Sequence, residues 1–156
     1  MTNDPNASLS VSIRDLTSVH VACIEYKATA DRSDMHDKIG ECFRRVQGWL
    51  RERDYDPMTQ LTVGVINMVD GQLVSYDCCV QVPEGVQSGS EGVDVKDLAG
   101  GRYAVLSMQK DPAVIGSSIG RFYQEYVPRN QIDIDGARPT YEIYYESTME
   151  YCVPIL

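Results

Sequence analysis

The chain repeats one order of secondary-structure patterns, and this duplication restricts the possible folds more than any other feature of the sequence. In each copy, a strand-like run is followed by a helical stretch and then by two more strand-like runs. The strand-like runs lie at 19–26, 61–69 and 75–82 in the first copy and at 102–108, 141–146 and 151–155 in the second, with helical stretches at 35–50 and 112–127. Two copies with so long a period indicate one pseudo-symmetric domain, because a solenoid needs three or more stacked units.

The predicted fold class is therefore α+β, with a duplicated β-α-β-β unit related by a pseudo-two-fold axis. We divide the chain into a polar N-terminal tail at 1–10 and a single domain at 11–156. Within the domain, 11–84 form the first repeat, 85–101 form a connector rich in Gly, Ser and Asp, and 102–156 form the second repeat. A chain of 156 residues can bury one sound core, so two full domains are not expected.

The first helical stretch has a start signal and an apolar face. Asp34 can cap the helix, with Asp37 three residues later in the manner of a capping box. The apolar side chains that recur at helical spacing, and that we expect to form core, are Met35, Ile39, Cys42, Phe43, Val46 and Leu50.

The second helical stretch begins with a capping acid and a proline, Asp111-Pro112. We expect Pro128 to end it. The segment 116–120 contains two glycines and two serines, which are poor helix formers. This helix is therefore expected to depend on packing against a sheet more than on intrinsic propensity.

Charge and hydropathy exclude several functional classes. The formal net charge of -9 argues against direct nucleic-acid binding, which needs a basic face to neutralise phosphates. No apolar run approaches the roughly 20 residues that span a bilayer, and the first ten residues lack the features of a secretory signal. We expect a cytoplasmic protein without a membrane segment.

The cysteines and histidines do not form a recognisable catalytic or metal-binding motif. Five cysteines have no metal-type spacing and are interpreted as reduced thiols, so neither a metal nor a cofactor is predicted. Alternation along a strand sends the side chains of Cys78 and Cys79 to opposite faces. His20 and His36 have no nucleophile motif near them and are expected to be structural.

Tyrosine is overrepresented, with ten Tyr against two Phe. A buried tyrosine must find a partner for its hydroxyl, so this excess indicates hydrogen-bonding needs or aromatic faces near water. In the strand at 141–146, alternation places Glu142, Tyr144 and Glu146 on one face and Tyr141, Ile143 and Tyr145 on the other. A glutamate in a pocket must be paired, and an organic cation held against tyrosine rings would satisfy it. The alternative is a Glu142 that simply faces solvent.

Several motifs, in this order and spacing, resemble the GyrI-like family. The most specific are Gly100-Gly101-Arg102-Tyr103-Ala104-Val105, the Glu-x-Tyr strand at Glu142-Ile143-Tyr144, and the closing Val153-Pro154-Ile155. This family is a small-molecule-binding domain that is also the effector-binding part of AraC-type and MerR-type multidrug-sensing regulators. The resemblance covers the chain from about residue 11 to the C-terminus.

The chain departs from the family pattern in places. Members commonly carry a glycine shortly after the first strand of each repeat, where this chain has Tyr26-Lys27-Ala28 and Met108-Gln109-Lys110-Asp111. Asp70-Gly71 replaces a family segment and is typical of a hairpin turn. A DNA-binding helix-turn-helix region is not recognised in the sequence.

The resemblance implies a curved antiparallel sheet with two long helices flanking a ligand groove between the repeats. Glu142 matches the family's glutamate that binds planar cations, and Tyr144 follows it in the same motif. Tyr103 matches an aromatic of the glycine turn, with a ring that either faces the pocket or packs beneath the sheet. Trp49 matches an aromatic near the end of the first helix, which either belongs to the core or contacts the ligand. We also expect Tyr26 among the ligand contacts.

Three roles follow from the resemblance. The first is a stand-alone protein that binds cationic or amphipathic drug-like compounds, as a sensor or a sequestering protein. The second is a hydrolase of electrophilic cyclopropanoid toxins, in which Glu142 would act as general base with Tyr144. The third is a module in the style of a gyrase inhibitor, binding a protein partner through the acidic loop at 84–97.

Overall fold

The computed structural model describes residues 9–87 and 89–156, which form one antiparallel sheet of eight strands with helices on one face. Both copies of the predicted β-α-β-β unit are present, as β2-α1-β3-β4 and β6-α2-β7-β8. In chain order the elements are β1 (Ser10–Leu16), β2 (Val19–Lys27), α1 (Met35–Arg51), η1 (Pro57–Thr59), β3 (Thr62–Val69), β4 (Gln72–Gln81), β5 (Asp94–Leu98), β6 (Gly101–Gln109), α2 (Pro112–Arg121), η2 (Phe122–Tyr126), α3 (Val127–Arg129), β7 (Thr140–Tyr144) and β8 (Thr148–Pro154).

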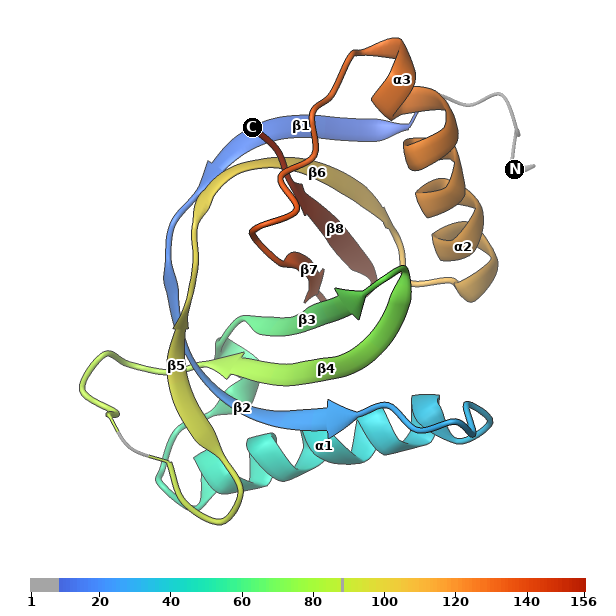
Figure 1. The fold of residues 1–156 in the computed structure, drawn as a ribbon. Helices are drawn as coiled ribbons and strands as arrows, with labels where there is room; N and C mark the ends of the chain where they lie inside the picture. The colour runs from blue at the N-terminus through green and yellow to red at the C-terminus, as the bar shows by residue number, and fades with distance from the viewer. Residues whose placement is uncertain (1–8, 88) are drawn as a thin grey trace.

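The strand order places the two repeats side by side in one sheet. It runs β1-β6-β8-β7-β3-β4-β2-β5, so β7 of the second repeat pairs directly with β3 of the first. Figure 1 shows the sheet curving strongly, with α1 and α2 lying outside the curve and well apart from each other. The β3–β7 pair is the seam between the repeats.

Alternation along the strands divides the buried side chains into an inner core and three helix-facing clusters, two against α1 and one against α2. The inner core lies on the concave face of the sheet and includes Val63, Cys79, Tyr103 and Tyr141. On the other face, α1 packs against β2 and β4, and α2 packs against β6. The central strands β3 and β7 therefore lie in the interval between the two helices.

Two strands were not predicted from the sequence. β1 covers one edge by pairing with β6, and β5, inside the predicted connector, covers the other by pairing with β2. Both are edge strands with mostly exposed or half-buried side chains, so their sequences lack the strong alternation of a central strand.

The helix ends confirm one capping prediction and correct two others. Asp111 Oδ1 accepts a hydrogen bond from the backbone N–H of Ala113 at 3.0 Å, as expected for the cap of α2. Asp34 occupies the N-cap position of α1, but its side chain makes no capping hydrogen bond, so the capping box was wrong. Pro128 does not end the second helix, which continues through the π-helical η2 into α3. The helical run ends at Arg129, one residue after Pro128.

Local turn chemistry is confirmed at the tip of the β3–β4 hairpin. Asp70 and Gly71 have φ angles of 51° and 77°, the left-handed conformations that a tight two-residue hairpin requires. Across the described ranges, no helix is long and apolar enough to cross a membrane.

Candidate functional site

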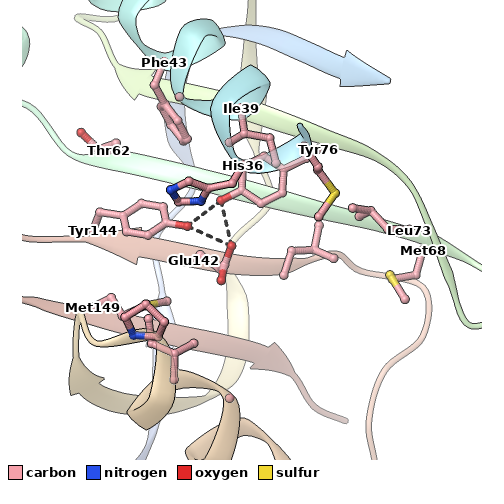
Figure 2. A pocket seen from close by; sticks show the side chains of 16 residues that line it. His36, Ile39, Phe43, Thr62, Met68, Leu73, Tyr76, Glu142, Tyr144 and Met149 are labelled. Atoms are coloured by element: carbon pink, nitrogen blue, oxygen red, sulfur yellow. Dashed lines mark hydrogen bonds between the residues drawn. The ribbon is translucent and has the colours of Figure 1, made fainter. Parts of the chain in front are cut away.

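A cavity of about 770 Å³ lies over the β3–β7 seam, between the N-terminal half of α1 and the start of α2 (Figure 2). It occupies the interval that the two helices leave uncovered. Its lining residues are Met35, His36, Ile39, Gly40, Phe43, Thr62, Ile66, Met68, Leu73, Tyr76, Pro112, Ile115, Gly116, Glu142, Tyr144 and Met149. Most of these side chains are apolar or aromatic, and Glu142 is the one carboxylate among them.

Glu142 is held by two tyrosine hydroxyls that come from different repeats. Tyr76 of β4 donates to Glu142 Oε1 at 2.8 Å, and Tyr144 of β7 donates to the same oxygen at 3.0 Å. The two hydroxyl oxygens are themselves 2.8 Å apart, so the three oxygens form a triangle in which the two phenol protons serve two of the three contacts at a time (Figure 2). These bonds orient the carboxylate at the floor of the cavity.

Both tyrosines stay protonated at physiological pH. Burial, followed by the charge of Glu142, raises the pKa of Tyr76 and of Tyr144 well above the usual tyrosine value. Neutral phenols are therefore available as hydrogen-bond donors to the carboxylate. The site presents a negative charge that is stabilised by hydrogen bonds alone.

Glu142 has no ion pair with any residue that the structure describes. A charge removed from water is costly unless a partner of opposite charge offsets the lost hydration. Glu142 is only half-buried, so the open cavity still hydrates it. The arrangement is suited to a cation that enters the cavity from outside.

Aromatic rings form the walls around the carboxylate. Phe43 of α1 meets the rings of Tyr76 and Tyr144 edge-on, with centroids 6.2 and 6.0 Å apart. The Tyr144 ring also has the ammonium of Lys110 5.9 Å from its centroid, although that ammonium is bound to the backbone oxygens of Tyr145 and Glu146. An organic cation would therefore find aromatic surfaces as well as a carboxylate.

The structure brings together two of the five residues predicted to bind a ligand, Glu142 and Tyr144. The predicted alternation of the 141–146 run is confirmed where the strand forms, because Tyr141 and Ile143 enter the inner core. β7 ends at Tyr144, so Glu146 lies outside the strand.

Tyr103, Trp49 and Tyr26, the other three residues of the predicted ligand site, do not line this cavity. Tyr103 is fully buried in the inner core, stacks on Tyr141 at 5.4 Å, and donates to the backbone oxygen of Pro139 at 3.1 Å. Trp49 packs beyond the cavity, donates to Ser90 Oγ at 3.1 Å, and lies under the guanidinium of Arg53.

Tyr26 is buried in the cluster behind the cavity wall that also contains Tyr76, Met35 and Ile39. Its hydroxyl is buried and has no hydrogen-bond partner among the described residues. Tyr26 is thus a neighbour of the site in the packing, but it does not contribute to the surface of the cavity.

Sequence reasoning missed Tyr76 and assigned Phe43 to the core. Tyr76 belongs to a predicted strand, and alternation could have placed it on the same face as Cys78. No sequence pattern indicates that its ring crosses a neighbouring strand to reach Glu142. Phe43 was correctly placed on the apolar face of α1, but part of that face borders the cavity and remains half-buried.

The histidines have different roles. His20 is structural, as predicted: its Nδ1 lies 2.6 Å from Asp97 Oδ1, and its Nε2 lies 2.5 Å from the backbone oxygen of Val86. His36 is exposed and lines the cavity from α1 (Figure 2). Cys78 and Cys79 point to opposite faces, as predicted, and both are fully buried.

Comparisons with known proteins agree with this geometry. The family model for the GyrI-like small molecule binding domain matches residues 9–155. A DNA gyrase inhibitor of Escherichia fergusonii is 25% identical over 129 residues, which make up 76% of this chain and 83% of that protein.

Two solved structures share the fold. SAV2435, solved with bound tetraphenylphosphonium, gives a TM-score of 0.63 at 18% identity and covers 94% of both chains. EcmrR, in a complex with DNA, gives a TM-score of 0.74 at 9% identity and covers 94% of this chain and 57% of that one. At such identities, the likeness is one of fold.

Proposed function

This chain belongs to the GyrI-like small-molecule-binding family, and we propose that it binds an organic cation of drug-like size in the cavity over the β3–β7 seam. In this role it acts as a sensor or a sequestering protein for cationic or amphipathic compounds. The observation that carries the proposal is the carboxylate of Glu142, which two phenols orient at the floor of an otherwise apolar and aromatic cavity.

The chemistry of the cavity supports an organic cation over a metal ion or an anion. A metal ion would need several oxygen, nitrogen or sulfur ligands close together, whereas one carboxylate is available among the described lining residues. An anion would meet the charge of Glu142 without an arginine or lysine in the lining. A large cation with apolar substituents fits both the charge and the walls.

The cavity volume supports a ligand with several rings. About 770 Å³ lies within the range of roughly 300–1,000 Å³ that is usual for small-molecule sites. SAV2435 was solved with tetraphenylphosphonium, a cation with four phenyl rings and no hydrogen-bond donor. We take this ion as the first probe for the present chain.

The test is isothermal titration calorimetry with tetraphenylphosphonium and with neutral triphenylphosphine oxide, on the wild type and on Glu142→Gln. We expect saturable binding of the cation, and a loss of about tenfold or more in the variant, because a close charge pair contributes roughly 1.5 kcal/mol or more. Triphenylphosphine oxide should bind both proteins with affinities within about twofold of each other.

Equal losses for the cation and the neutral compound would contradict the assignment of Glu142 as the charge anchor. Absence of binding by a folded wild type would contradict the proposal and direct attention to a protein partner. The similarity to a DNA gyrase inhibitor makes gyrase the first partner to test in that case.

The same two proteins, the wild type and Glu142→Gln, also test the hydrolase role that the family resemblance predicts. Incubation with an electrophilic cyclopropane compound, followed by mass spectrometry of the small molecule, detects consumption. Glu142-dependent addition of water would establish an enzyme, whereas an unchanged compound that binds saturably is the result expected of a sensor or sequestering protein.

A further inference from the structure

Gly64 and Glu142 occupy equivalent positions in the two repeats. β2 and β6 are both nine residues long, so their middle residues correspond. From the middle of β2 the pairing leads through β4 to Val63 of β3, and from the middle of β6 it leads through β8 to Tyr141 of β7. The next residues along these strands are Gly64 and Glu142, which also face each other across the seam.

The missing side chain at Gly64 creates the space that Tyr76 occupies. A Cβ atom built on Gly64 would lie 1.7 Å from Tyr76 Oη and 2.3 Å from Tyr76 Cζ. Such distances are far inside van der Waals contact, and a glycine within a strand often marks a close approach of this kind. The ring of Tyr76 therefore crosses β3 over Gly64, and its hydroxyl reaches Glu142 on the next strand.

The site is asymmetric because equivalent positions of the two repeats carry different residues, glycine in the first and glutamate in the second. The second repeat supplies a carboxylate, and the first supplies a gap that a phenol fills. Tyr76 is almost fully buried, and its ring is held by the edge contact with Phe43, so the ring has little freedom to move away. The site consequently contains one negative charge with a fixed donor beside it.

We propose that Gly64 is a positioning residue that directs Tyr76 onto Glu142 and thereby gives the cavity its selectivity for cationic over neutral ligands. This inference rests on the proposed cation-binding function. Gly64 acts on the ligand only through Tyr76 and Glu142.

The experiment combines Gly64→Ala with Tyr76→Leu, whose shorter side chain leaves room for the added Cβ. Calorimetry with tetraphenylphosphonium and triphenylphosphine oxide gives the ratio of their affinities, which is a measure of charge selectivity. We expect Gly64→Ala to lower the affinity for the cation by about tenfold, since displacing Tyr76 releases the carboxylate from its orientation and so misplaces a close charge pair. The neutral compound should change by less than about twofold.

In the Tyr76→Leu background, the further change Gly64→Ala should alter the affinity for the cation by less than about twofold, because the two residues act through one contact. Gly48→Ala is the matched control, since a Cβ atom there meets nothing within 4 Å and Gly48 lies outside the cavity. Thermal unfolding followed by circular dichroism reports whether each variant folds.

A Gly64→Ala protein that binds the cation like the wild type overturns the inference. So does an equal loss for both compounds, or an additive loss in the double variant. If Gly64→Ala does not fold, recovery of folding in the double variant supports the contact with Tyr76, and failure to recover overturns it. If Glu142→Gln weakens binding of the cation but Gly64→Ala does not, the proposed function stands and this inference alone is contradicted.

Discussion

Glu142 and Glu150 lie on neighbouring strands, but their surroundings differ in one decisive respect. Glu150 faces the concave side of β8, where Arg14 of β1 forms an ion pair with it at 2.8 Å and Tyr145 donates to it at 2.7 Å. Glu142 faces the helix side of β7 and has tyrosine donors but no cation among the described residues. Both carboxylates are half-buried.

The difference separates a structural carboxylate from a candidate binding residue. The protein itself supplies the cation for Glu150, so that carboxylate ties β1 to the rest of the sheet. Burial, followed by the hydrogen bond to Glu150, also raises the pKa of Tyr145 to about 12, which keeps its hydroxyl protonated. Beside Glu142, open cavity takes the position that Arg14 occupies beside Glu150. We therefore assign that position to the positive charge of a ligand.

Supplying Glu142 with an internal cation should abolish the difference and give the largest effect. Thr62 lines the cavity and pairs with Tyr144, two positions along the seam from the Gly64–Glu142 pair and therefore on the same face of the sheet. We expect Thr62→Lys to weaken binding of tetraphenylphosphonium by about fiftyfold, through pairing with Glu142 and repulsion of the ligand. Calorimetry measures the change.

Thr62→Met is the matched control for the length of the new side chain. It should bind the cation within about threefold of the wild type, since it adds no charge. Equal weakening by lysine and methionine would mean that blockage of the cavity, and not charge, explains the loss.

Removing the internal cation of Glu150 should lower stability and leave binding unchanged. Arg14→Met strands Glu150 beside the inner core, and we expect the free energy of unfolding to fall by about 1 kcal/mol. The expected fall in the free energy of unfolding is small because the Arg14 side chain is 44% exposed and solvent screens the pair. Urea denaturation measures it as a shift in midpoint at constant slope.

The double variant Arg14→Met with Glu150→Gln should recover most of this loss, because no unpaired charge remains. Its affinity for tetraphenylphosphonium should match that of the wild type. A loss of binding in the double variant would show that the two carboxylates are coupled, against the separation drawn above.

A third carboxylate, Asp97, pairs with His20, whose charge depends on pH. Changing this pair should give the smallest effect. The contacts of His20 to Asp97 and to the backbone oxygen of Val86 need two N–H donors, which only the imidazolium provides. The hydrogen bond to Val86, followed by that to Asp97, raises the pKa of His20 above its usual value. The resulting stability is fully present below about pH 6.5 and is lost as pH rises through the raised pKa.

We therefore expect the stability difference between the wild type and His20→Gln to be larger at pH 6 than at pH 9. Urea denaturation at the two pH values measures it, with Glu142→Gln as a variant whose stability difference should not follow this trend. A difference that is constant with pH would contradict the charged state assigned to His20.

Sequence reasoning was most successful where the relevant interactions are local. The period of two in the 141–146 run correctly placed Glu142 and Tyr144 on one face, because alternation depends only on the strand itself. The apolar face of α1 was also predicted correctly. Whether the N-terminal half of that face is covered by other side chains, however, depends on where α2 lies. Phe43 therefore borders a cavity, although its pattern was that of a core residue.

The misplaced aromatic residues show where local reasoning stops. Alternation predicts which residues share a face with Tyr103, but not whether that face is the inner core or the helix side. Trp49 lies six residues beyond Phe43 on α1, roughly 9 Å further along the helix axis. This distance is enough to remove it from the cavity and pack it against β2 and β4.

The sequence by itself determined the duplicated order of elements, the hairpin turn at Asp70-Gly71 and the cap at Asp111, because each depends on interactions within a few residues. The tertiary structure alone decided that Tyr76 meets Glu142 across Gly64 and that Arg14 meets Glu150. These contacts join residues far apart in the chain, and they depend on strand register and on which strands become neighbours. Only the assembled sheet fixes these two properties, so only the structure distinguishes the carboxylate that has its cation from the one that lacks it.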